Sequence, residues 1–167
     1  MLIANAGIGI FAQFEALTYE EVQSGVAVNA LHPVFTIKTL LAQMTRNKSA
    51  IIVTSSGLGQ TPVCGIHSAC KSFSSFIAES LSYELRGKVD VLSYMAGETT
   101  TKMLGRDTTD MHTVSAERAV QVCFRDLGHT PMTRGAFRHE VGGYWSSFFP
   151  LRWNQASIMN NSWYRKT

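Results

Sequence analysis

The chain has 167 residues, of which 45% are hydrophobic and 16% charged, with a formal net charge of +3. This length and composition predict one folded domain, 1–167, with a buried core, and exclude a disordered chain, a collagen-like repeat and a coiled coil. The charge is low and scattered, so nucleic acid is not an expected partner. No stretch reaches the roughly 20 consecutive apolar residues of a spanning helix, so we expect none.

The three cysteines, Cys64, Cys70 and Cys123, are an odd number without a C-x-x-C pair. This pattern favours reduced, mostly buried thiols in a reducing compartment. The N-terminus has no charged region followed by a long apolar stretch, so we expect no signal peptide. Both features predict an intracellular protein.

The first half of the chain alternates strand and helix patterns. Residues 2–4 are apolar and predict a short strand, and Thr18 with Glu21 fits a capping box that begins a helix. Residues 31–44 predict a longer helix, with Pro33 near its first turn. The uninterrupted apolar run 50–53 predicts a strand covered on both faces of a parallel sheet.

The second half continues the alternation. We expect a helix over 68–85 closed by Gly87, a strand over 89–95, a helix from about 115 to 127 followed by Gly128, and a last strand over 136–141. Strands that alternate with helices build an α/β fold, a Rossmann-like parallel sheet with helices on both faces. Ligands of such sheets bind beyond the carboxyl ends of the strands, which here are the segments after Ala4, Val53 and Met95.

A G-x-G-x-x-A sequence at residues 7–12 matches the dinucleotide-binding fingerprint. Only three apolar residues precede it as a strand, and the next acidic residues, Glu20 and Glu21, lie in the capping box. We interpret the match as fortuitous.

A set of short motifs in a fixed order is more informative. It consists of Asn5-Ala6-Gly7, Val28-Asn29-Ala30, the run from Ile51 to Gly57, His67-Ser68-Ala69-Cys70-Lys71, and Ala96-Gly97 with Thr101. This set resembles the short-chain dehydrogenase/reductase family, and the tail with Gly135, His139 and Ile158-Met159-Asn160 resembles its very-long-chain 3-ketoacyl-CoA reductase and 17-beta-hydroxysteroid dehydrogenase branch. The family's phosphate loop precedes the N-A-G motif, so the resemblance implies the C-terminal part of the fold only.

The resemblance also implies site residues. Asn29, Ser56, His67 and Lys71 stand at the catalytic positions, where Ser56 polarises a substrate carbonyl and Asn29 completes a proton path to Lys71. NADP or NAD is the implied cofactor. The implied cofactor-binding residues are Asn5, Ala6, Gly7, Lys71, Gly97, Thr99 and Thr101. No metal is implied, and Ser55 is the alternative to Ser56.

His67 occupies the position of the family's tyrosine, and three interpretations of it remain open. It is a neutral remnant, because the charge of Lys71 one helical turn away lowers the imidazole pKa. Alternatively it is a substitute acid, or a metal ligand in Cys64-x-x-His67-x-x-Cys70.

The resemblance implies NAD(P)H-dependent reduction of a keto group on a long acyl or steroid substrate, impaired here by His67 and by the missing phosphate loop. The alternative is a non-catalytic relic, or a binding or oligomerisation module. We expect a homo-oligomer or a partner-dependent chain. Residues 148–167 form a C-terminal tail that mixes aromatic and cationic residues, which is compatible with peripheral membrane contact or with packing on the sheet. The expected location is cytoplasmic or at the endoplasmic reticulum.

Overall fold

The computed structural model describes residues 1–105 and 107–160 and contains one parallel sheet. Its strands lie in the order β1 (Leu2–Ala4), β2 (Ser49–Ser56), β3 (Val89–Ala96) and β4 (Met132–Thr133). The registers Ala4 with Val53 and Ser56 with Ala96 bring the carboxyl ends of the first three strands to one edge. The predicted α/β class and parallel sheet are therefore confirmed.

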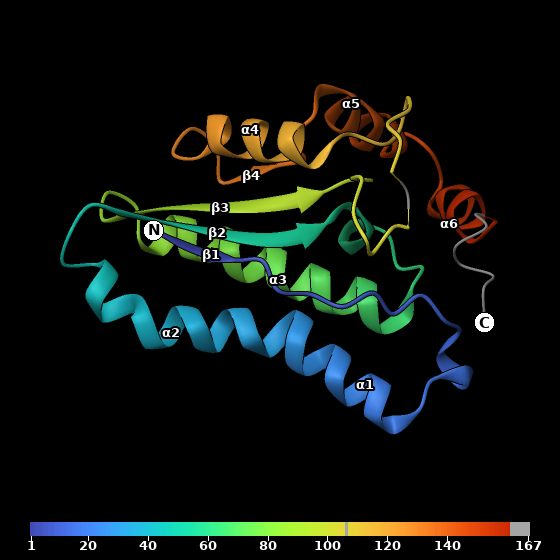
Figure 1. Cartoon of the computed structure of the whole chain (residues 1–167), viewed down its shortest axis with the longest axis horizontal. Helices are drawn as coiled ribbons and strands as arrows, with labels where there is room; N and C mark the ends of the chain where they lie inside the picture. Colours follow the sequence, from blue (N-terminus) through green and yellow to red (C-terminus); the bar gives the residue numbers. More distant parts are fainter. Residues whose placement is uncertain (106, 161–167) are drawn as a thin grey trace.

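Helices cover both faces of the sheet (Figure 1). One face carries α1 (Tyr19–Val26), the π-helical turn η2 (Ala27–Leu31), α2 (His32–Met44) and α3 (Gly65–Glu84), whereas α4 (Ala116–Asp126) covers the other. The short turns η1 (Phe14–Ala16) and η3 (Gly57–Gln60) lie in loops, and α5 (Phe137–Ser146) and α6 (Leu151–Met159) follow β4. The described part of the C-terminal tail, 148–160, thus contains a helix.

The central strand β2 is buried on both faces, as its uninterrupted apolar run predicts. Because side chains of a strand alternate between faces, Ile51 and Val53 pack toward Ile37 of α2, while Ile52 packs toward Ala119 of α4. Two hydrophobic layers therefore hold the sheet between its helices.

Local sequence signals set most helix ends. Thr18 and Glu21 form the predicted capping box, with the Thr18 Oγ1 accepting from the Glu21 amide and the Glu21 carboxylate accepting from the Thr18 amide. Gly87 and Gly128 both have φ of +80°, a left-handed conformation that suits glycine and ends a helix. Helix α3 begins three residues earlier than predicted, at Gly65.

The strand predicted over residues 136–141 is wrong. The last strand is Met132–Thr133, and it ends before Gly135, whose φ of +76° turns the chain. Ala136 then starts α5, and the Glu140 carboxylate accepts a hydrogen bond from the Thr133 hydroxyl at 3.1 Å. Residues 136–141 are therefore the first turns of a helix, which side-chain hydrogen bonds hold to the turn before it.

The continuous helix Tyr19–Met44 is long and apolar enough to cross a membrane, which the sequence analysis did not expect. A helix that covers a sheet has the same composition, because one of its faces is apolar. Here Ile37 and Met44 pack against Ala4, Ile51 and Val53 of the sheet. Packing on β1 and β2 accounts for Ile37 and Met44, whereas Leu31 and Phe35 of the same helix remain 41% and 64% exposed.

The outer edge of β1 has no strand beside it in the described part of the chain. Ile3 in this strand is 46% exposed. An uncovered parallel edge offers free amide and carbonyl groups to another strand, and a charged side chain discourages that pairing.

We therefore expect the isolated chain 1–167 to self-associate, and Ile3→Lys to shift it toward the monomer. Size-exclusion chromatography with light scattering measures this, and Tyr19→Lys, at an exposed position on α1, is the control. A monomeric parent with protected amides at residues 2–4 would show that this edge is not an association site.

Candidate functional site

The side chain of Asn29 binds the loop that follows β1. Its Oδ1 accepts from the Ile8 amide at 3.0 Å and its Nδ2 donates to the Ile8 carbonyl at 2.9 Å, and the side chain is fully buried. Gly7 lies directly against this pair, because a Cβ there would lie 3.1 Å from Asn29 Oδ1 and 3.2 Å from Lys71 Nζ. The structure therefore brings the N-A-G segment, Asn29 and Lys71 together, as the resemblance implies.

The backbone carbonyl of Asn29 has an unusual partner. Pro33 stands four residues later, where an α-helix would supply an amide donor, and proline has no amide hydrogen. The helix widens into the π turn η2 at this point, and the Ser74 hydroxyl of α3 donates to the Asn29 carbonyl at 2.7 Å. Sequence reasoning did not identify Ser74, although the Asn29 to Pro33 spacing signals a free carbonyl.

Lys71 is buried, with 6% of its surface exposed, and its ammonium donates to the Thr54 carbonyl at 3.0 Å. Burial holds the pKa of Lys71 below its usual value. Ser55 is also held, since its hydroxyl donates to the Lys71 carbonyl at 2.6 Å and accepts from Ser75 at 2.8 Å. Ser55 is thus a buried link between β2 and α3, and its hydroxyl proton is already used in that link.

Ser56 ends β2 and is only half-buried. Its Oγ accepts from the Leu58 amide at 3.2 Å and so caps the short turn η3. This contact uses an oxygen lone pair and leaves the hydroxyl proton to donate elsewhere. Ser56 is therefore able to donate a hydrogen bond to a carbonyl oxygen at the carboxyl edge of the sheet.

His67 lies in the first turns of α3 and is 3% exposed. Burial first, and the charge of Lys71 second, lower its pKa from 6.5 to about 4, while a backbone hydrogen bond at Ile8 acts in the opposite direction. The Phe11 ring covers the imidazole at a centroid distance of 4.9 Å, and the buried Nδ1 has no hydrogen-bond partner. A pKa of about 4 keeps His67 neutral at pH 7, which favours the neutral remnant among the three interpretations, and burial contributes more to it than Lys71.

The other implied cofactor-binding residues lie at two strand ends. Asn5 and Ala6 are exposed after β1, Thr101 is exposed in the loop after β3, and the Thr99 hydroxyl donates to the Gly97 carbonyl at 3.1 Å. The His139 ring of α5 lies over Gly97, where a Cβ would come within 2.4 Å of its Nδ1. The sequence analysis named His139 only within the tail that carries the resemblance, and no local pattern links two positions so far apart.

The fold also tests the interpretation of two further sequence motifs. The turn after the G-x-G-x-x-A sequence is η1 at Phe14–Ala16, and the first α-helix begins only at Tyr19, so these glycines do not open a helix as those of the fingerprint do. Cys64, Cys70 and Cys123 are free and buried. Across residues 1–105 and 107–160, no three His, Cys, Asp or Glu side chains converge as metal ligands, which argues against the Cys64, His67 and Cys70 set.

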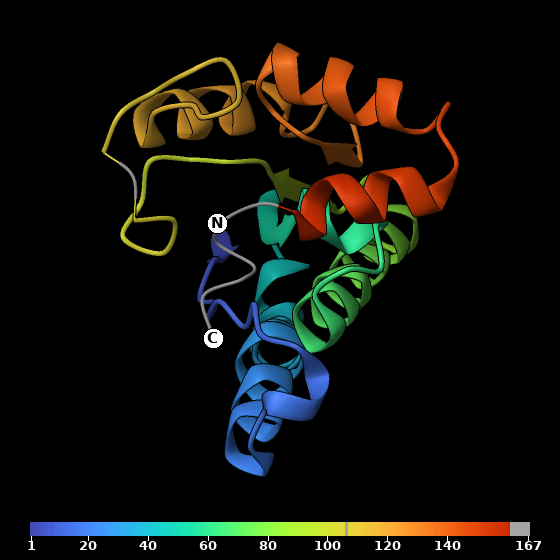
Figure 2. The same ribbon diagram turned by 90° about the vertical axis from the view of Figure 1, so that its right-hand side faces the viewer.

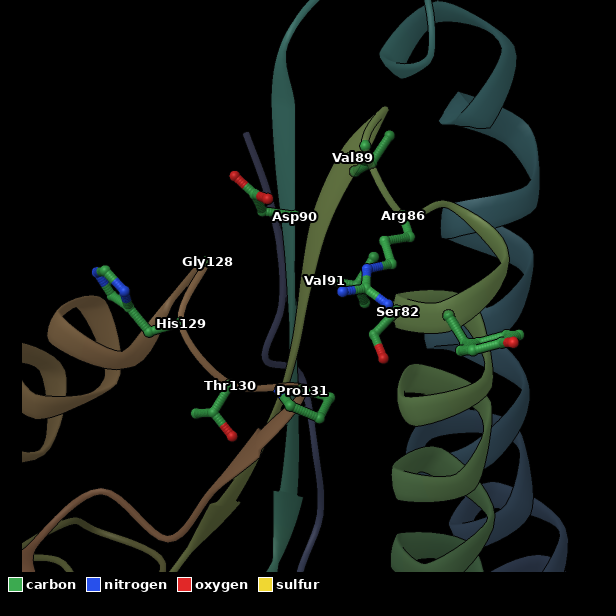
Figure 3. A pocket seen from close by; sticks show the side chains of 11 residues that line it. Ser82, Arg86, Val89, Asp90, Val91, Gly128, His129, Thr130 and Pro131 are labelled. Carbon is green, nitrogen blue, oxygen red and sulfur yellow. The ribbon is translucent and has the colours of Figure 1, made fainter.

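A pocket of about 400 Å³ lies at the opposite end of the sheet (Figure 3). It is lined by Ser82 of α3, by Arg86 in the turn after that helix, by Asp90 of β3, and by His129 and Pro131. These residues surround the amino end of β3, away from the Asn29, Lys71 and His67 cluster. The pocket is therefore separate from the candidate site.

The low pKa of His67 predicts a pH-dependent stability. Between pH 6.5 and about 4 the unfolded chain takes up a proton that folded His67 does not, so the free energy of unfolding falls as pH falls. The expected loss is on the order of 3 kcal/mol at about 1.4 kcal/mol per pKa unit. We expect His67→Gln to lose less stability than the parent chain over this range.

Urea unfolding at pH 7.0, 5.5 and 4.5 measures this difference, because the carboxylates that titrate in both proteins cancel. Equal losses in the parent and the variant would contradict a buried, neutral His67.

Comparisons with known proteins agree with this geometry. A family model described as short chain dehydrogenase matches residues 1–112. No curated protein sequence matches the chain significantly.

Three solved structures have the same fold. A 7beta-hydroxysteroid dehydrogenase superposes with a TM-score of 0.77 at 21% identity, over 93% of this chain and 64% of its own. A short-chain dehydrogenase from Burkholderia cenocepacia in complex with NADP superposes with a TM-score of 0.74 at 21% identity, over 95% of this chain and 69% of its own. A 3-ketoacyl-(acyl-carrier-protein) reductase from Brucella melitensis complexed with NADH superposes with a TM-score of 0.67 at 22% identity, over 81% of this chain and 67% of its own.

This chain thus spans 64% to 69% of the length of these three proteins. Identities of 21% to 22% to these structures show the fold, and the family rests on the sequence model. Because that model covers more than half of the chain, the protein belongs to the short-chain dehydrogenase/reductase family.

Proposed function

We propose that the chain carries the carbonyl-reducing part of a short-chain dehydrogenase/reductase, whose reaction is NAD(P)H-dependent reduction of a keto group on a long acyl or steroid substrate. Asn29, Ser56 and Lys71 occur in the family's order along the chain, which supports this proposal. Their position at the carboxyl edge of the sheet supports it as well. The similar structures include a hydroxysteroid dehydrogenase and a 3-ketoacyl reductase. We extend the resemblance to the very-long-chain ketoacyl reductase branch as part of the same proposal.

The residues present fit the nicotinamide end of such a cofactor, which supplies a hydride when bound. The absence of a Cβ at Gly7 leaves room beside Lys71, and the Lys71 ammonium uses one of its three donors on Thr54. The remaining donors suit the hydroxyl groups of a ribose. The choice between NADP and NAD depends on residues that contact the adenosine ribose, and the motifs found in residues 1–167 include none of them.

Ser56 and Lys71 give the site its polarity. The Ser56 hydroxyl donates to the substrate carbonyl and makes the carbon more electrophilic, while the Lys71 charge favours the oxyanion that forms on reduction. Asn29 acts through position, because its two bonds to Ile8 fix the Gly7 segment beside Lys71. These three residues bind and orient the substrate and the segment beside Lys71. The product oxygen still needs a proton from another group.

The state of His67 determines the rate of ketone reduction that we propose. His67 stands where the family has a tyrosine, and it is neutral, buried and covered by Phe11. A neutral imidazole is a poor acid, and burial keeps this ring away from solvent. We therefore propose that this chain reduces ketones slowly or not at all.

A binding or oligomerisation module is the second candidate function. The contact between Phe11 and His67 favours it, because the chain's own loop covers the position that a proton donor would occupy. Such a module would keep the fold and its association surfaces without turning over substrate.

The first test measures cofactor binding. No glycine-rich phosphate loop precedes Asn5 in this sequence, so the groups that cradle a pyrophosphate elsewhere in the family are not supplied by these residues. We expect titration calorimetry of the chain 1–167 with NADPH and NADH to give dissociation constants weaker than about 1 mM. A micromolar site would correspond to a binding free energy of about −8 kcal/mol. Micromolar binding of either cofactor would contradict this expectation.

The second test restores the acid. An amino-terminal phosphate-loop segment from a family relative is fused ahead of Met1, and His67→Tyr is compared with the parent fusion in reduction of a steroid ketone and a 3-ketoacyl thioester. General acid catalysis typically contributes about 10²- to 10⁴-fold, so a gain of this order in kcat is expected.

His67→Phe is the control, because it fills the space without supplying a proton. Equal rates for the His and Tyr forms would show that His67 is a competent acid, or that the step needs none. Activity of neither fusion, with NADPH bound, would favour the binding module.

A further inference from the structure

Helices α5 and α6 carry a continuous aromatic surface, which we define by the rings of Tyr144, Trp145, Phe148, Phe149 and Trp153. Trp145 lies 6.2 Å from both Phe148 and Phe149, Phe149 lies 6.3 Å from Trp153, and Tyr144 lies 5.2 Å from Phe148, all between ring centroids. The rings therefore form one surface, and not separate exposed side chains.

The fold does not cover this surface. Tyr144, Trp145, Phe148 and Trp153 each expose between 64% and 68% of their area, and no residue within α5 or α6 is buried. Both helices lie toward the carboxyl ends of the strands, and Figure 2 shows them as neighbours. In many proteins a large exposed apolar patch marks a site that binds another protein, a membrane or a ligand.

The charge around the rings is positive. The described residues of α5, α6 and the turn between them, 137–160, contain Arg138 and Arg152 against the single acid Glu140. Glu140 is already paired with Arg134 at 3.2 Å, whereas Arg152 is exposed next to Trp153. Helix α6 contains no acidic residue. The surface therefore combines indole and phenol rings with uncompensated positive charge.

We propose that the aromatic surface binds a lipid bilayer that contains anionic headgroups. Tryptophan and tyrosine favour the level of the headgroups, because their rings are apolar and their N–H or O–H groups stay hydrated. Arginine attracts anionic lipids, and its side chain reaches the headgroups while its methylenes remain in apolar surroundings. The chain attaches to one leaflet through α5 and α6 and does not span the membrane there, since α6 has only nine residues.

The positive charge distinguishes a bilayer from a second copy of this chain. Two identical surfaces in contact would bring Arg152 of one copy close to the same positive surface of the other, with no free acid opposite. A strand that completed the sheet would add beside β1, whereas α5 follows β4 at the opposite edge of the sheet. Neither arrangement covers the rings as well as an anionic lipid surface does.

The tryptophans make the test specific. All three, Trp145, Trp153 and Trp163, lie in the last 23 residues, so tryptophan emission reports on this segment alone. The chain 1–167 is mixed with vesicles of phosphatidylcholine, or of phosphatidylcholine and phosphatidylserine at about 3:1, and bound protein is separated by flotation, which leaves aggregates in the dense fraction. Binding to anionic vesicles, a blue shift of emission and quenching by brominated lipids are expected, with weaker binding in high salt.

Matched variants connect binding to the surface. We expect Trp145→Ser with Trp153→Ser to weaken vesicle binding at least tenfold, because both rings leave the bilayer. Arg152→Gln is expected to reduce the preference for anionic vesicles about fivefold. Phe35→Ser with Phe76→Ser is the control, since these rings on α2 and α3 are exposed to a similar extent, and binding is expected to stay unchanged.

Circular dichroism confirms that each variant keeps the helix content of the parent. The proposal is overturned if the folded parent does not float with anionic vesicles, or if the double tryptophan variant binds as tightly as the parent. It is also overturned if the blue shift follows protein concentration without lipid, which would make a second copy the occupant. These outcomes do not depend on reductase activity, so they are distinct from a failure of the proposed function.

Discussion

The two hydrogen bonds between Asn29 and the Ile8 backbone are the contact on which the rest of the site depends. They join the loop after β1 to the widened helical turn η2, and the Ser74 hydroxyl joins that turn to α3 through the Asn29 carbonyl. Three segments that are distant in sequence are thereby fixed around Gly7. Because the Asn29 and Ser74 side chains are buried, loss of one partner leaves a buried polar group unsatisfied, which costs more than one ordinary hydrogen bond.

This buried network explains the electrostatics of the site. Lys71 donates to the Thr54 carbonyl inside the fold, and its pKa falls because water is excluded. The same exclusion, together with the neighbouring ammonium, keeps the imidazole of His67 neutral. A tyrosine at this position would gain from the lysine, because the positive charge favours the phenolate. A histidine responds in the opposite way, since its charged form is the cation.

The candidate site and the aromatic surface are physically connected. Phe11, which covers His67, packs with Val63 and Cys64, and Ile158 of α6 packs against the same pair. The helix that we propose to contact lipid therefore shares an apolar cluster with the ring that closes the site. In a protein whose proposed substrates are long acyl chains or steroids, this arrangement places the membrane-facing side next to the carboxyl edge of the sheet.

The sequence alone determined the α/β class, the order of most strands and helices, the capping box at Thr18 and the identity of the motif residues. These features depend on periodicity and on single residues whose backbone preferences are local. It did not predict that residues 136–141 begin a helix, because the hydrogen bonds of Glu140 to the turn before it exist only in the folded chain.

The tertiary structure alone decided which serine is available and how strongly His67 is perturbed. Ser55 and Ser56 are adjacent in sequence and point to opposite faces of β2, so one is buried against α3 and the other caps η3. The pKa of His67 depends mainly on burial, and burial is a property of everything packed around a residue. The ring of His139 over Gly97 has the same origin, since only the folded chain brings α5 to the end of β3.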